Sequence, residues 1–493
     1  MNSRSIARFS GPSVALLCTT TLDIPGFPEA AAMLGIASWM AIWWISECVP
    51  LALTALIPLV CFPLFGISTG KEIAPRYLNS IIFLFIGGFL IAQAMENTGL
   101  HKRIALNMLA RLHASPLQLA FGFSLATAFL SMWISNTATT MLMVTIALPL
   151  LHRLMEEHGK ETIAPMAASF LLIIAYSANI GGMGTPVGTA PNLVFLENMR
   201  ISAPESVPSF LEWMMIGIPM VIAGLAVLFA VLGPGLARLP WKQSDGTALN
   251  RSLQELGAIR FEEKAVGWVL SITALLWMSR KGIQTESFNI PGWAGLLPYK
   301  GVDDGTVAIL MASLLFLFRS KENGAILNTQ SFRKLPCDIV LLLGGGFALA
   351  YGMLHSGLSA WIGNQLEFLG SVPLPLMLLG IALVIVFLTE ITSNTATTQV
   401  MLPILAAASL SSGMDITSTL LVATLTASCA FMLPVATPPN AIVFGSGHVP
   451  MQSMIKSGIR LNLMMIFVVA TLVYLIRPLL PATRRESGRL RVA

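Results

Sequence analysis

The hexapeptide SNTATT occupies residues 135–140 and again residues 393–398, each time within a long apolar stretch. Serine, asparagine and threonine donate and accept hydrogen bonds, and none of them is charged. In lipid an unpaired backbone group costs several kcal/mol, so an interrupted helix is tolerated only where it is buried in protein or lines a water-filled cavity. The two copies therefore predict helices that are broken at Ser-Asn-Thr and that form a binding site.

The composition is that of a polytopic membrane protein. Of the 493 residues, 55% are apolar and 11% are charged, whereas soluble proteins carry about 25% charged residues. Helices of about 20 residues cross the hydrocarbon core of a bilayer. We expect an all-α membrane protein with about 11 transmembrane helices, near residues 11–24, 29–47, 49–66, 116–152, 163–180, 207–233, 265–280, 304–319, 372–412, 416–433 and 459–480.

Other classes of function find little support in the sequence. The net charge is +5, and no basic run with interleaved aromatic residues indicates a nucleic-acid partner. The five cysteines are scattered without CxxC spacing, and the histidines show no metal-ligand spacing. A membrane-embedded enzyme is an alternative, but it would need an activated nucleophile or a metal cluster, and the sequence indicates neither.

The chain contains an internal repeat. A shift of 258 residues aligns residues 81–100 with residues 339–358, and without a gap it aligns FLSMWISNTATT with FLTEITSNTATT. One register that serves two blocks indicates a repeated structural unit. Many secondary transporters contain such repeats in inverted orientation. We expect two inverted repeats, each with a glycine-containing re-entrant hairpin, about 79–98 and 336–358, followed by a helix broken at Ser-Asn-Thr.

A third pair of segments follows the hexapeptides. GGMGTPVGTAPN occupies residues 181–192, and LPVATPPN occupies residues 433–440. Matching TAPN to TPPN needs a shift of 248, ten less than before, so we expect extra residues in this loop of the first copy. Thr185-Pro186 competes as the partner of Thr437-Pro438, and the alignment stays open at this point.

The polar residues fit an anion together with cations. Free N–H groups at a helix N-terminus attract anionic oxygen, and two such ends suit a substrate with two anionic groups. No Lys or Arg lies between residues 115 and 151 or between 363 and 443, so co-bound Na⁺ is expected to offset the charge. Ser131 and Thr389, each four residues before a motif serine, are candidate Na⁺ ligands. Glu390, whose repeat partner is Met132, either caps backbone or binds an ion.

These motifs resemble those of the divalent anion/sodium symporter (DASS) family of di- and tricarboxylate transporters, over about residues 29–475. The resemblance implies a homodimer and an elevator-like movement. In each protomer, residues 1–78 and 205–334 would form a scaffold domain, and residues 79–204 and 335–480 a transport domain, with a tail at 481–493. The basic tail departs from the family pattern, which leaves the orientation of the C-terminus open.

The resemblance also implies the site residues. The substrate carboxylates would be held by Ser135, Asn136, Thr137, Ser393, Asn394, Thr395, Thr437 and Pro438. One Na⁺ site would use Ser131, Ser135, Asn136 and Gly184, and the second would use Thr389, Thr392, Asn394 and Ala436. The partners would be a dicarboxylate, Na⁺, membrane lipid and a second copy of the chain.

We therefore expect a multi-pass protein of the inner membrane that takes up C4-dicarboxylates such as succinate, fumarate or malate by symport with Na⁺. SNTATT in both halves, with hydroxyls at Ser131 and Thr389, resembles the sodium-coupled branch of the family. A sodium-independent exchanger of di- or tricarboxylates, and citrate or sulfate as the main substrate, are the alternatives within transport.

Overall fold

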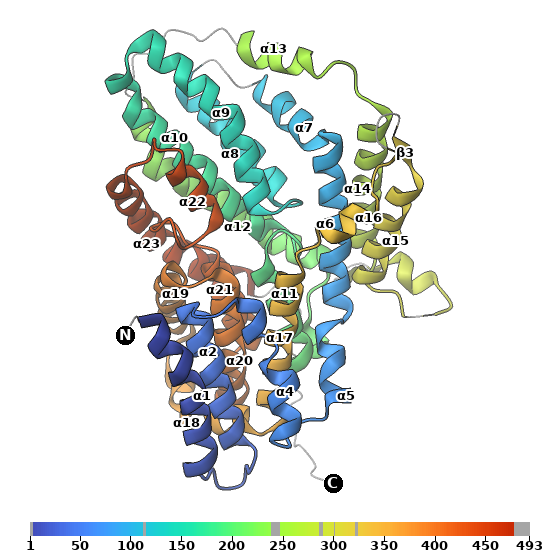
Figure 1. The fold of residues 1–493 in the computed structure, drawn as a ribbon, viewed down its shortest axis with the longest axis vertical. Coiled ribbons are helices and arrows are strands. Elements are labelled where there is room, and N and C mark those ends of the chain that lie inside the picture. Colours follow the sequence, from blue (N-terminus) through green and yellow to red (C-terminus); the bar gives the residue numbers. More distant parts are fainter. Residues whose placement is uncertain are drawn as a thin grey trace.

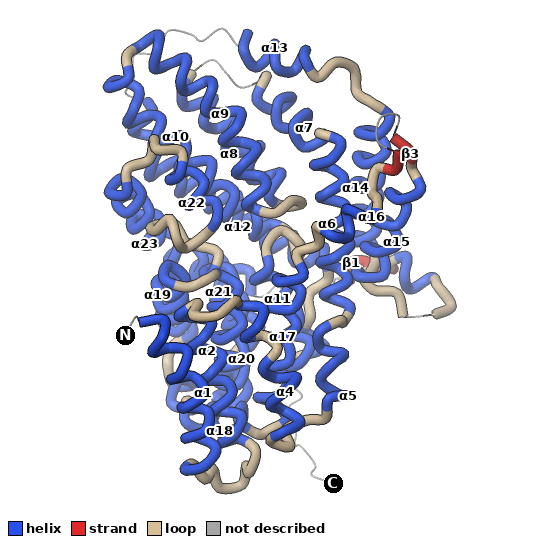
Figure 2. The backbone as a smooth tube through the Cα atoms, viewed as in Figure 1, coloured by secondary structure: helices blue, strands red, loops and turns tan. Residues whose placement is uncertain are grey.

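The fold is almost entirely helical (Figure 2). The computed structural model describes residues 3–111, 115–237, 247–284, 289–299, 301–320 and 324–477. In this part of the chain, strands occur only as two short antiparallel pairs, β1 (Gly282–Gln284) with β2 (Asn289–Pro291), and β3 (Arg319–Ser320) with β4 (Gly324–Ala325). The predicted all-α fold is confirmed, whereas the predicted tail, 481–493, lies outside the described residues.

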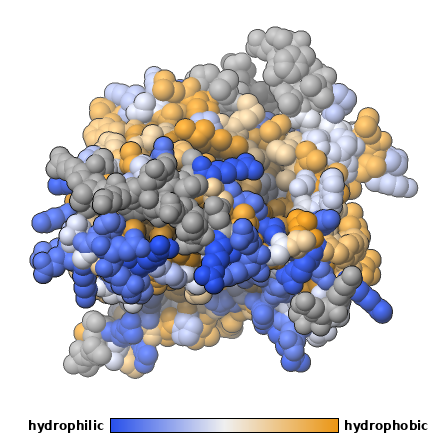
Figure 3. Space-filling view, turned by 90° about the horizontal axis from the view of Figure 1, so that it is seen from above, coloured by the Kyte–Doolittle hydropathy of each residue, from blue (hydrophilic) through white to orange (hydrophobic). Residues whose placement is uncertain are grey.

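Seven helical segments within the described residues are long and apolar enough to cross a membrane: Gly70–Thr98, Asn136–His158, Lys160–Gly184, Phe210–Leu236, Cys337–His355, Leu374–Ile391 and Met451–Ile476. Shorter apolar helices accompany them: Ala30–Ser46, Leu51–Leu64, Pro116–Ser131, Asp304–Leu317 and Ile416–Ala427. Large apolar side chains remain exposed on these helices, among them Leu317 and Leu475. Figure 3 shows hydrophobic residues at the surface beside a group of hydrophilic ones. An exposed apolar surface of this kind suits contact with lipid.

The two glycine-containing segments are continuous helices, α6 (Ser80–Thr98) and α17 (Cys337–His355). The prediction that they form re-entrant hairpins is wrong, because their glycines serve close helix packing instead of turns. A Cβ atom at Gly87 would lie 2.5 Å from Cβ of Ala308 in α15 (Asp304–Leu317). A Cβ atom at Gly345 would likewise lie 2.5 Å from Cα of Ala55.

Instead, each hexapeptide lies at the turn of a hairpin that is formed by the helix before it and the helix after it (Figure 1). In the first copy, α8 (Pro116–Ser131) runs parallel to α10 (Lys160–Gly181), since Phe123 contacts Phe170 and Ser131 contacts Ala178. The helix between them, α9 (Asn136–His158), is joined to α10 by Gly159 alone and packs along it. Helices α8 and α9 are therefore antiparallel, with Ser135 in the turn between them.

The second copy has the same arrangement. Helix α19 (Leu374–Ile391) is preceded by the 3₁₀ turn η5 (Glu367–Ser371), which packs against α20 (Asn394–Ser412). A Cβ atom at Gly370 would lie 2.6 Å from the carbonyl oxygen of Ser412, so the start of α19 lies beside the end of α20. The predicted interruption at Ser-Asn-Thr is present in both copies, but the chain reverses there instead of continuing across.

Two further helices are interrupted at the glycine-, proline- and threonine-rich segments. Helix α10 is followed by the turn η2 (Gly182–Gly184) and by α11 (Ala190–Ser202). Helix α21 (Ile416–Ala427) is followed by an irregular segment and by α22 (Pro438–Gly445). The sequence predicted that the extra residues of the first copy lie in this loop, and that prediction is wrong. They lie in the helices before it, because α9 and α10 have 23 and 22 residues whereas α20 and α21 have 19 and 12.

The remaining helices surround these elements. Helix α12 (Phe210–Ala237) packs against α10, and α23 (Met451–Ile476) packs against α12, α19 and α21. Helix α6 packs against α15 and α14 (Phe261–Ser279). The other elements are α1 (Ser3–Thr21), α2 (Ala30–Ser46), α3 (Leu51–Thr54), α4 (Ile57–Leu64), α5 (Gly70–Ile73), η1 (Ala74–Tyr77), α7 (Leu100–Leu109), η3 (Pro204–Ser206), α13 (Thr247–Glu255), η4 (Trp293–Leu296), α16 (Thr329–Arg333) and α18 (Leu358–Gln365).

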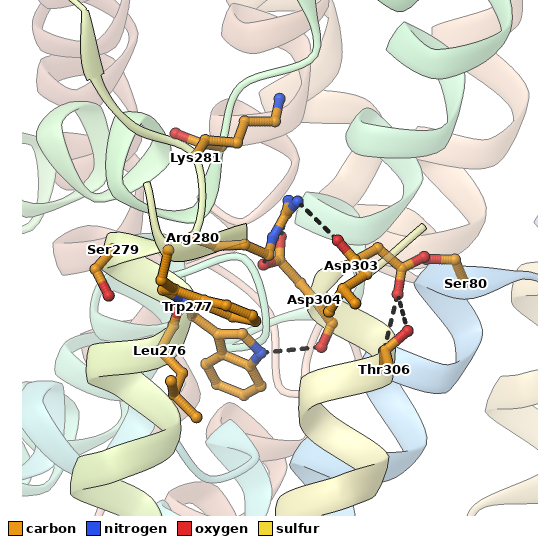
Figure 4. Close-up of polar contacts among 12 residues, drawn as sticks. Ser80, Leu276, Trp277, Ser279, Arg280, Lys281, Asp303, Asp304 and Thr306 are labelled. Carbon is orange, nitrogen blue, oxygen red and sulfur yellow. Dashed lines mark hydrogen bonds and ion pairs between the residues drawn. The ribbon is translucent and has the colours of Figure 1, made fainter. Parts of the chain in front are cut away.

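A polar cluster joins α14, α15 and the start of α6 (Figure 4). The guanidinium of Arg280 donates two hydrogen bonds to the carboxylate of Asp304, at 2.5 and 3.0 Å. Asp303 accepts a hydrogen bond from the hydroxyl of Ser80, and the indole N–H of Trp277 donates to the carbonyl oxygen of Asp304 at 3.0 Å. Paired planar groups of this kind fix orientation, so the cluster ties these three helices together at one end.

Candidate functional site

One cavity of about 620 Å³ is lined by both hexapeptides. All eight residues predicted to hold substrate line it, namely Ser135, Asn136, Thr137, Ser393, Asn394, Thr395, Thr437 and Pro438, and Ala436 lines it as well. Ser131, Thr389, Thr392 and Gly184 are buried and are not among the residues that line the cavity. The tertiary structure thus gathers residues from both repeats around a single space.

Several helices begin at the cavity, and four of them belong to the segments that the sequence singled out. Asn136, Ala190, Asn394 and Pro438, the first residues of α9, α11, α20 and α22, all line it. A helix N-terminus carries a partial positive charge and unpaired N–H groups, which favour an anion. Pro438 lacks an N–H group, so α22 offers the cavity its dipole rather than this donor. The sequence predicted two such ends, and the structure adds those of α11 and α22.

The two motif serines differ in their hydrogen bonding. Ser135 caps α9, and its Oγ atom accepts a hydrogen bond from the backbone N–H of Ala138 at 3.3 Å. Ser393 is the residue before α20, but its side chain makes no capping hydrogen bond. The hydroxyl of Ser393 is therefore free of this role, and the two halves of the cavity are not chemically identical.

Each motif asparagine contributes its Oδ1 atom to a group of three oxygen atoms. In the first repeat, Oγ of Ser131 lies 2.6 Å from Oδ1 of Asn136 and 2.8 Å from the carbonyl oxygen of Ala178. Ser131 is fully buried. Hydroxyl and carbonyl oxygens are the hard ligands that alkali and alkaline-earth cations use in proteins. The group therefore has the ligand chemistry of a small cation site.

The second repeat reproduces this geometry with a threonine. Oγ1 of Thr389 lies 2.7 Å from Oδ1 of Asn394 and 2.8 Å from the carbonyl oxygen of Ala427. Thr389 is also fully buried. Ser131 and Thr389, the two candidate Na⁺ ligands, thus occupy equivalent positions next to the motif asparagines.

Two other predicted Na⁺ ligands have different neighbours. A Cβ atom at Gly184 would meet the side chain of Met132 at 2.8 Å, whereas one at Gly182 would meet Oδ1 of Asn136 at 2.7 Å. Gly182 is therefore the glycine that lies directly against the motif asparagine. The hydroxyl of Thr392 donates to the carbonyl oxygen of Leu388 at 2.8 Å and lies 2.5 Å from Oγ1 of Thr397.

Asn179 connects the two repeats and was not singled out from the sequence. Its Nδ2 atom donates to Oγ1 of Thr437 at 3.2 Å and to the carbonyl oxygen of Ala430 at 3.4 Å. Its Oδ1 atom accepts from Nδ2 of Asn136 at 3.5 Å. Asn179 is buried and lines the cavity. An asparagine within the apolar stretch 163–180 was the available signal, since a polar group there needs partners.

Two asparagines hold the irregular segments of the broken helices. Nδ2 of Asn192 donates to the carbonyl oxygens of Gly182 and Thr185, at 3.0 and 2.8 Å. Nδ2 of Asn440 donates to those of Ala430 and Leu433, both at 3.0 Å. Donors and acceptors in the two copies are all 248 residues apart, so TAPN corresponds to TPPN. The alternative partner, Thr185-Pro186, is excluded.

Glu390 caps the second irregular segment. Its Oε1 atom accepts hydrogen bonds from the backbone N–H groups of Phe431 and Met432 at 2.7 and 2.8 Å, and its Oε2 atom accepts from that of Leu433 at 3.1 Å. Nδ2 of Asn462 donates to Oε1 at 2.7 Å. Of the two roles left open by the sequence, the structure displays the capping of backbone.

Met132, the repeat partner of Glu390, also contacts the irregular segment of its own repeat, through its backbone carbonyl. The carbonyl oxygen of Met132 accepts a hydrogen bond of 2.5 Å from the hydroxyl of Thr185 in the first irregular segment. Each hairpin turn is thus joined to the broken helix of its own repeat, through a hydroxyl in one copy and a carboxylate in the other.

Comparisons with known proteins identify the family of this chain. The family described as the sodium:sulfate symporter transmembrane region matches residues 12–480. The sodium-dependent dicarboxylate transporter SdcS of Staphylococcus aureus strain bovine RF122 / ET3-1 is 38% identical over 479 residues, which cover 95% of this chain and 90% of that protein. SdcS of strain MRSA252 matches with the same identity and coverage.

Two solved structures share the fold at low identity. The YdaH transporter of Alcanivorax borkumensis aligns with a TM-score of 0.54 and 14% identity, over 85% of this chain and 88% of that one. MtrF of Neisseria gonorrhoeae aligns with a TM-score of 0.56 and 14% identity, over 94% and 96%. The bacterial relatives agree with the predicted inner-membrane location. The chain thus belongs to the divalent anion/sodium symporter family, and it is a multi-pass membrane transporter and not an enzyme.

Proposed function

We propose that this transporter takes up C4-dicarboxylates such as succinate, fumarate or malate together with Na⁺. The name of the relative SdcS, a sodium-dependent dicarboxylate transporter, supports both the coupling ion and the substrate class. The site supports them independently, because it combines helix N-termini suited to carboxylates with oxygen groups suited to a small cation.

The observation that carries this proposal is the lack of cationic side chains at the cavity. Among the described residues that line it, Asp338 is the charged one, and it is exposed. A dianion removed from water needs compensating charge, since uncharged donors alone leave a large desolvation penalty. Na⁺ ions bound beside Asn136 and Asn394 would supply that charge, and they would make anion binding depend on Na⁺.

In this proposal each motif asparagine has two roles. Its side chain holds the cation next to Ser131 or Thr389, while the first turn of its helix faces the substrate together with Ser135, Thr137, Ser393, Thr395, Thr437 and Pro438. An empty cation site then leaves the asparagine poorly oriented for the anion. Such a shared residue gives a reciprocal coupling between the two ligands.

The test is uptake of radiolabelled succinate into proteoliposomes, with an inward gradient of Na⁺ or of choline. We expect uptake with the Na⁺ gradient and none with the choline gradient. The Asn136→Ala and Asn394→Ala variants should lose this uptake while they still elute as folded protein. Equal succinate counterflow in Na⁺ and choline would instead identify an exchanger. Unlabelled malate, citrate and sulfate are the competitors, and sulfate is included because the family description names it. Stronger competition by sulfate than by malate would overturn the proposed substrate class.

We further propose an elevator-type movement. The moving unit would comprise α8–α12 and α19–α23, because α12 and α23 pack against the hairpins and broken helices. Helix α6 would stay with the scaffold, because it packs mainly against α15. This division differs from the sequence-based ranges, which placed α6, α7, α17 and α18 in the transport domain and α12 in the scaffold.

A buried amide at the boundary supports such a movement. Gln399 of α20 is fully buried against Gly346 of α17, and neither polar atom of its amide has a hydrogen-bond partner among the described residues. An unpaired buried amide costs free energy, and a movement of α20 relative to α17 that exposes or pairs the amide would relieve that cost. In a cysteine-free background, cross-linking Gly346→Cys to Gln399→Cys should stop uptake, and reduction should restore it; undiminished uptake after complete cross-linking would refute the movement.

The proposed assembly is a homodimer in the membrane, as the family resemblance implies. Light scattering of the detergent-purified protein, corrected for detergent mass, distinguishes one copy from two. The mass of a single 493-residue chain would overturn this part of the proposal.

A further inference from the structure

Two histidines that are far apart in the sequence meet at the surface. His152 lies near the end of α9, and His448 lies in the loop between α22 and α23. Their Nε2 atoms are 3.1 Å apart, and their ring centroids are 5.2 Å apart. His152 is exposed and His448 is half-buried, so small ions in solution can reach both. The two histidines are 296 residues apart along the chain, and no local sequence pattern indicates that they meet.

The distance between the two Nε2 atoms suits a shared metal ion. Zn²⁺ binds histidine nitrogen at about 2.0–2.1 Å, and two such ligands in tetrahedral geometry are roughly 3.3 Å apart. Little movement of either ring would therefore admit the ion. No group of three or more His, Cys, Asp and Glu side chains in the described part of the chain could hold a metal, so water would complete the coordination.

The charges around the pair do not attract a cation. Lys160 lies close enough to repel one, and the ion pair of Arg153 with Glu157 lies on the same helix end as His152. Coordination bonds and not net charge would therefore supply the affinity.

Helix α9, which carries His152, and helix α22, which precedes the loop with His448, both begin at the cavity. Helix α9 starts at Asn136 and α22 at Pro438, both of which line the cavity, and the two helices pack against each other. We propose that His152 and His448 form a two-histidine site for a divalent transition-metal ion such as Zn²⁺, which joins α9 of the first repeat to the loop after α22 of the second. Bound metal would restrain two elements whose first turns face the substrate cavity.

Binding is tested on the purified full-length protein, freed of metal with a chelator and titrated with ZnCl₂, with MgCl₂ as the ionic control. We expect Zn²⁺ to raise the unfolding temperature and to protect residues 445–450 from hydrogen exchange, and Mg²⁺ to do neither. His152→Ala and His448→Ala should each weaken Zn²⁺ binding by more than about tenfold, since even partners outside the first shell contribute 10–100-fold to metal affinity.

The matched control is His355→Ala. His355 stacks on Tyr351, away from the pair, so this variant should keep the full Zn²⁺ response. Should His448→Ala unfold without metal, His448→Gln tests the same ligand with a side chain of similar size. The proposal is overturned if the wild-type protein shows no Zn²⁺ response, or if the His152 and His448 variants keep it. None of these readouts requires transport, so their outcome is independent of the proposed substrate and coupling ion.

Discussion

The hydroxyl of Ser131 lies 2.6 Å from Oδ1 of Asn136, and its single proton cannot satisfy this oxygen and the carbonyl of Ala178 at the same time. Three oxygen atoms therefore meet with one hydrogen between them. Such a surplus of acceptors is unfavourable without a cation and favourable with one. The same surplus recurs at Thr389, next to Asn394.

Removing either hydroxyl should weaken Na⁺ activation of uptake. We expect Ser131→Ala and Thr389→Val to raise the half-saturating Na⁺ concentration roughly five- to thirty-fold, equivalent to about 1–2 kcal/mol. Thr389→Ser should stay close to wild type because it keeps the oxygen. The control is Thr127→Ala, which removes a buried hydroxyl that donates to Phe123 within the same helix. Equal Na⁺ activation curves for Ser131→Ala and wild type would contradict the assignment.

Neutralising Glu390 should destabilise the second broken helix. Three backbone N–H groups point at the carboxylate, and the amide of Glu390→Gln would replace one acceptor oxygen with a donor. Hydrogen bonds to a buried charged group contribute about 1.5–3 kcal/mol each, so a clear fall in unfolding temperature is expected in detergent. Glu367→Gln, an exposed carboxylate in η5, is the control. A wild-type unfolding temperature for Glu390→Gln would show that the capping contributes little.

Asn192 and Asn440 should be equally important for stability. Each side chain satisfies two carbonyl oxygens of an irregular segment, and alanine would leave them unpaired at about 1–3 kcal/mol for each buried group. We expect both Asn192→Ala and Asn440→Ala to lower the unfolding temperature by similar amounts. Asn198→Ala is the matched control, because Asn198 donates within its own helix to Val194. If this control lowered the unfolding temperature as much, the loss could not be assigned to the irregular segments.

Two adjacent glycines of α6 should respond differently to alanine. A methyl group at Gly87 would lie 2.6 Å from the backbone carbon of Ala308, which cannot move without separating α6 from α15. At Gly88 the nearest atom is Cγ1 of Val187, at 3.6 Å. We expect Gly87→Ala to destabilise the protein by about 1–3 kcal/mol. Gly88→Ala should keep the stability but place its methyl group in the lining of the cavity.

Those two variants separate packing from binding. Thermal unfolding measures the first, and the concentration of succinate at half-maximal uptake measures the second. A Gly87→Ala protein as stable as Gly88→Ala would mean that α6 and α15 can move apart without loss.

Residue type and spacing predicted the two hexapeptides that the structure brings to one cavity. SNTATT recurs together with a hydroxyl residue four positions before its serine. The shift of 258 residues therefore aligned Ser131 with Thr389 and Asn136 with Asn394 as equivalent positions. The apolar composition required a membrane protein, and the absence of Lys and Arg near the motifs indicated cation coupling. These inferences depend on residue type and spacing, which the sequence states directly.

Which segments turn and which residues meet depends on long-range packing that the sequence does not state. Glycines such as Gly87 permit both a sharp turn and close contact between helices, and the choice depends on Ala308, more than 200 residues away. A break at Ser135 is equally compatible with a chain that continues and with one that reverses. The contacts of Asn179 with Thr437 and of His152 with His448 join separate repeats. Their side chains meet because helices from both repeats pack together in three dimensions, and no local pattern encodes that packing.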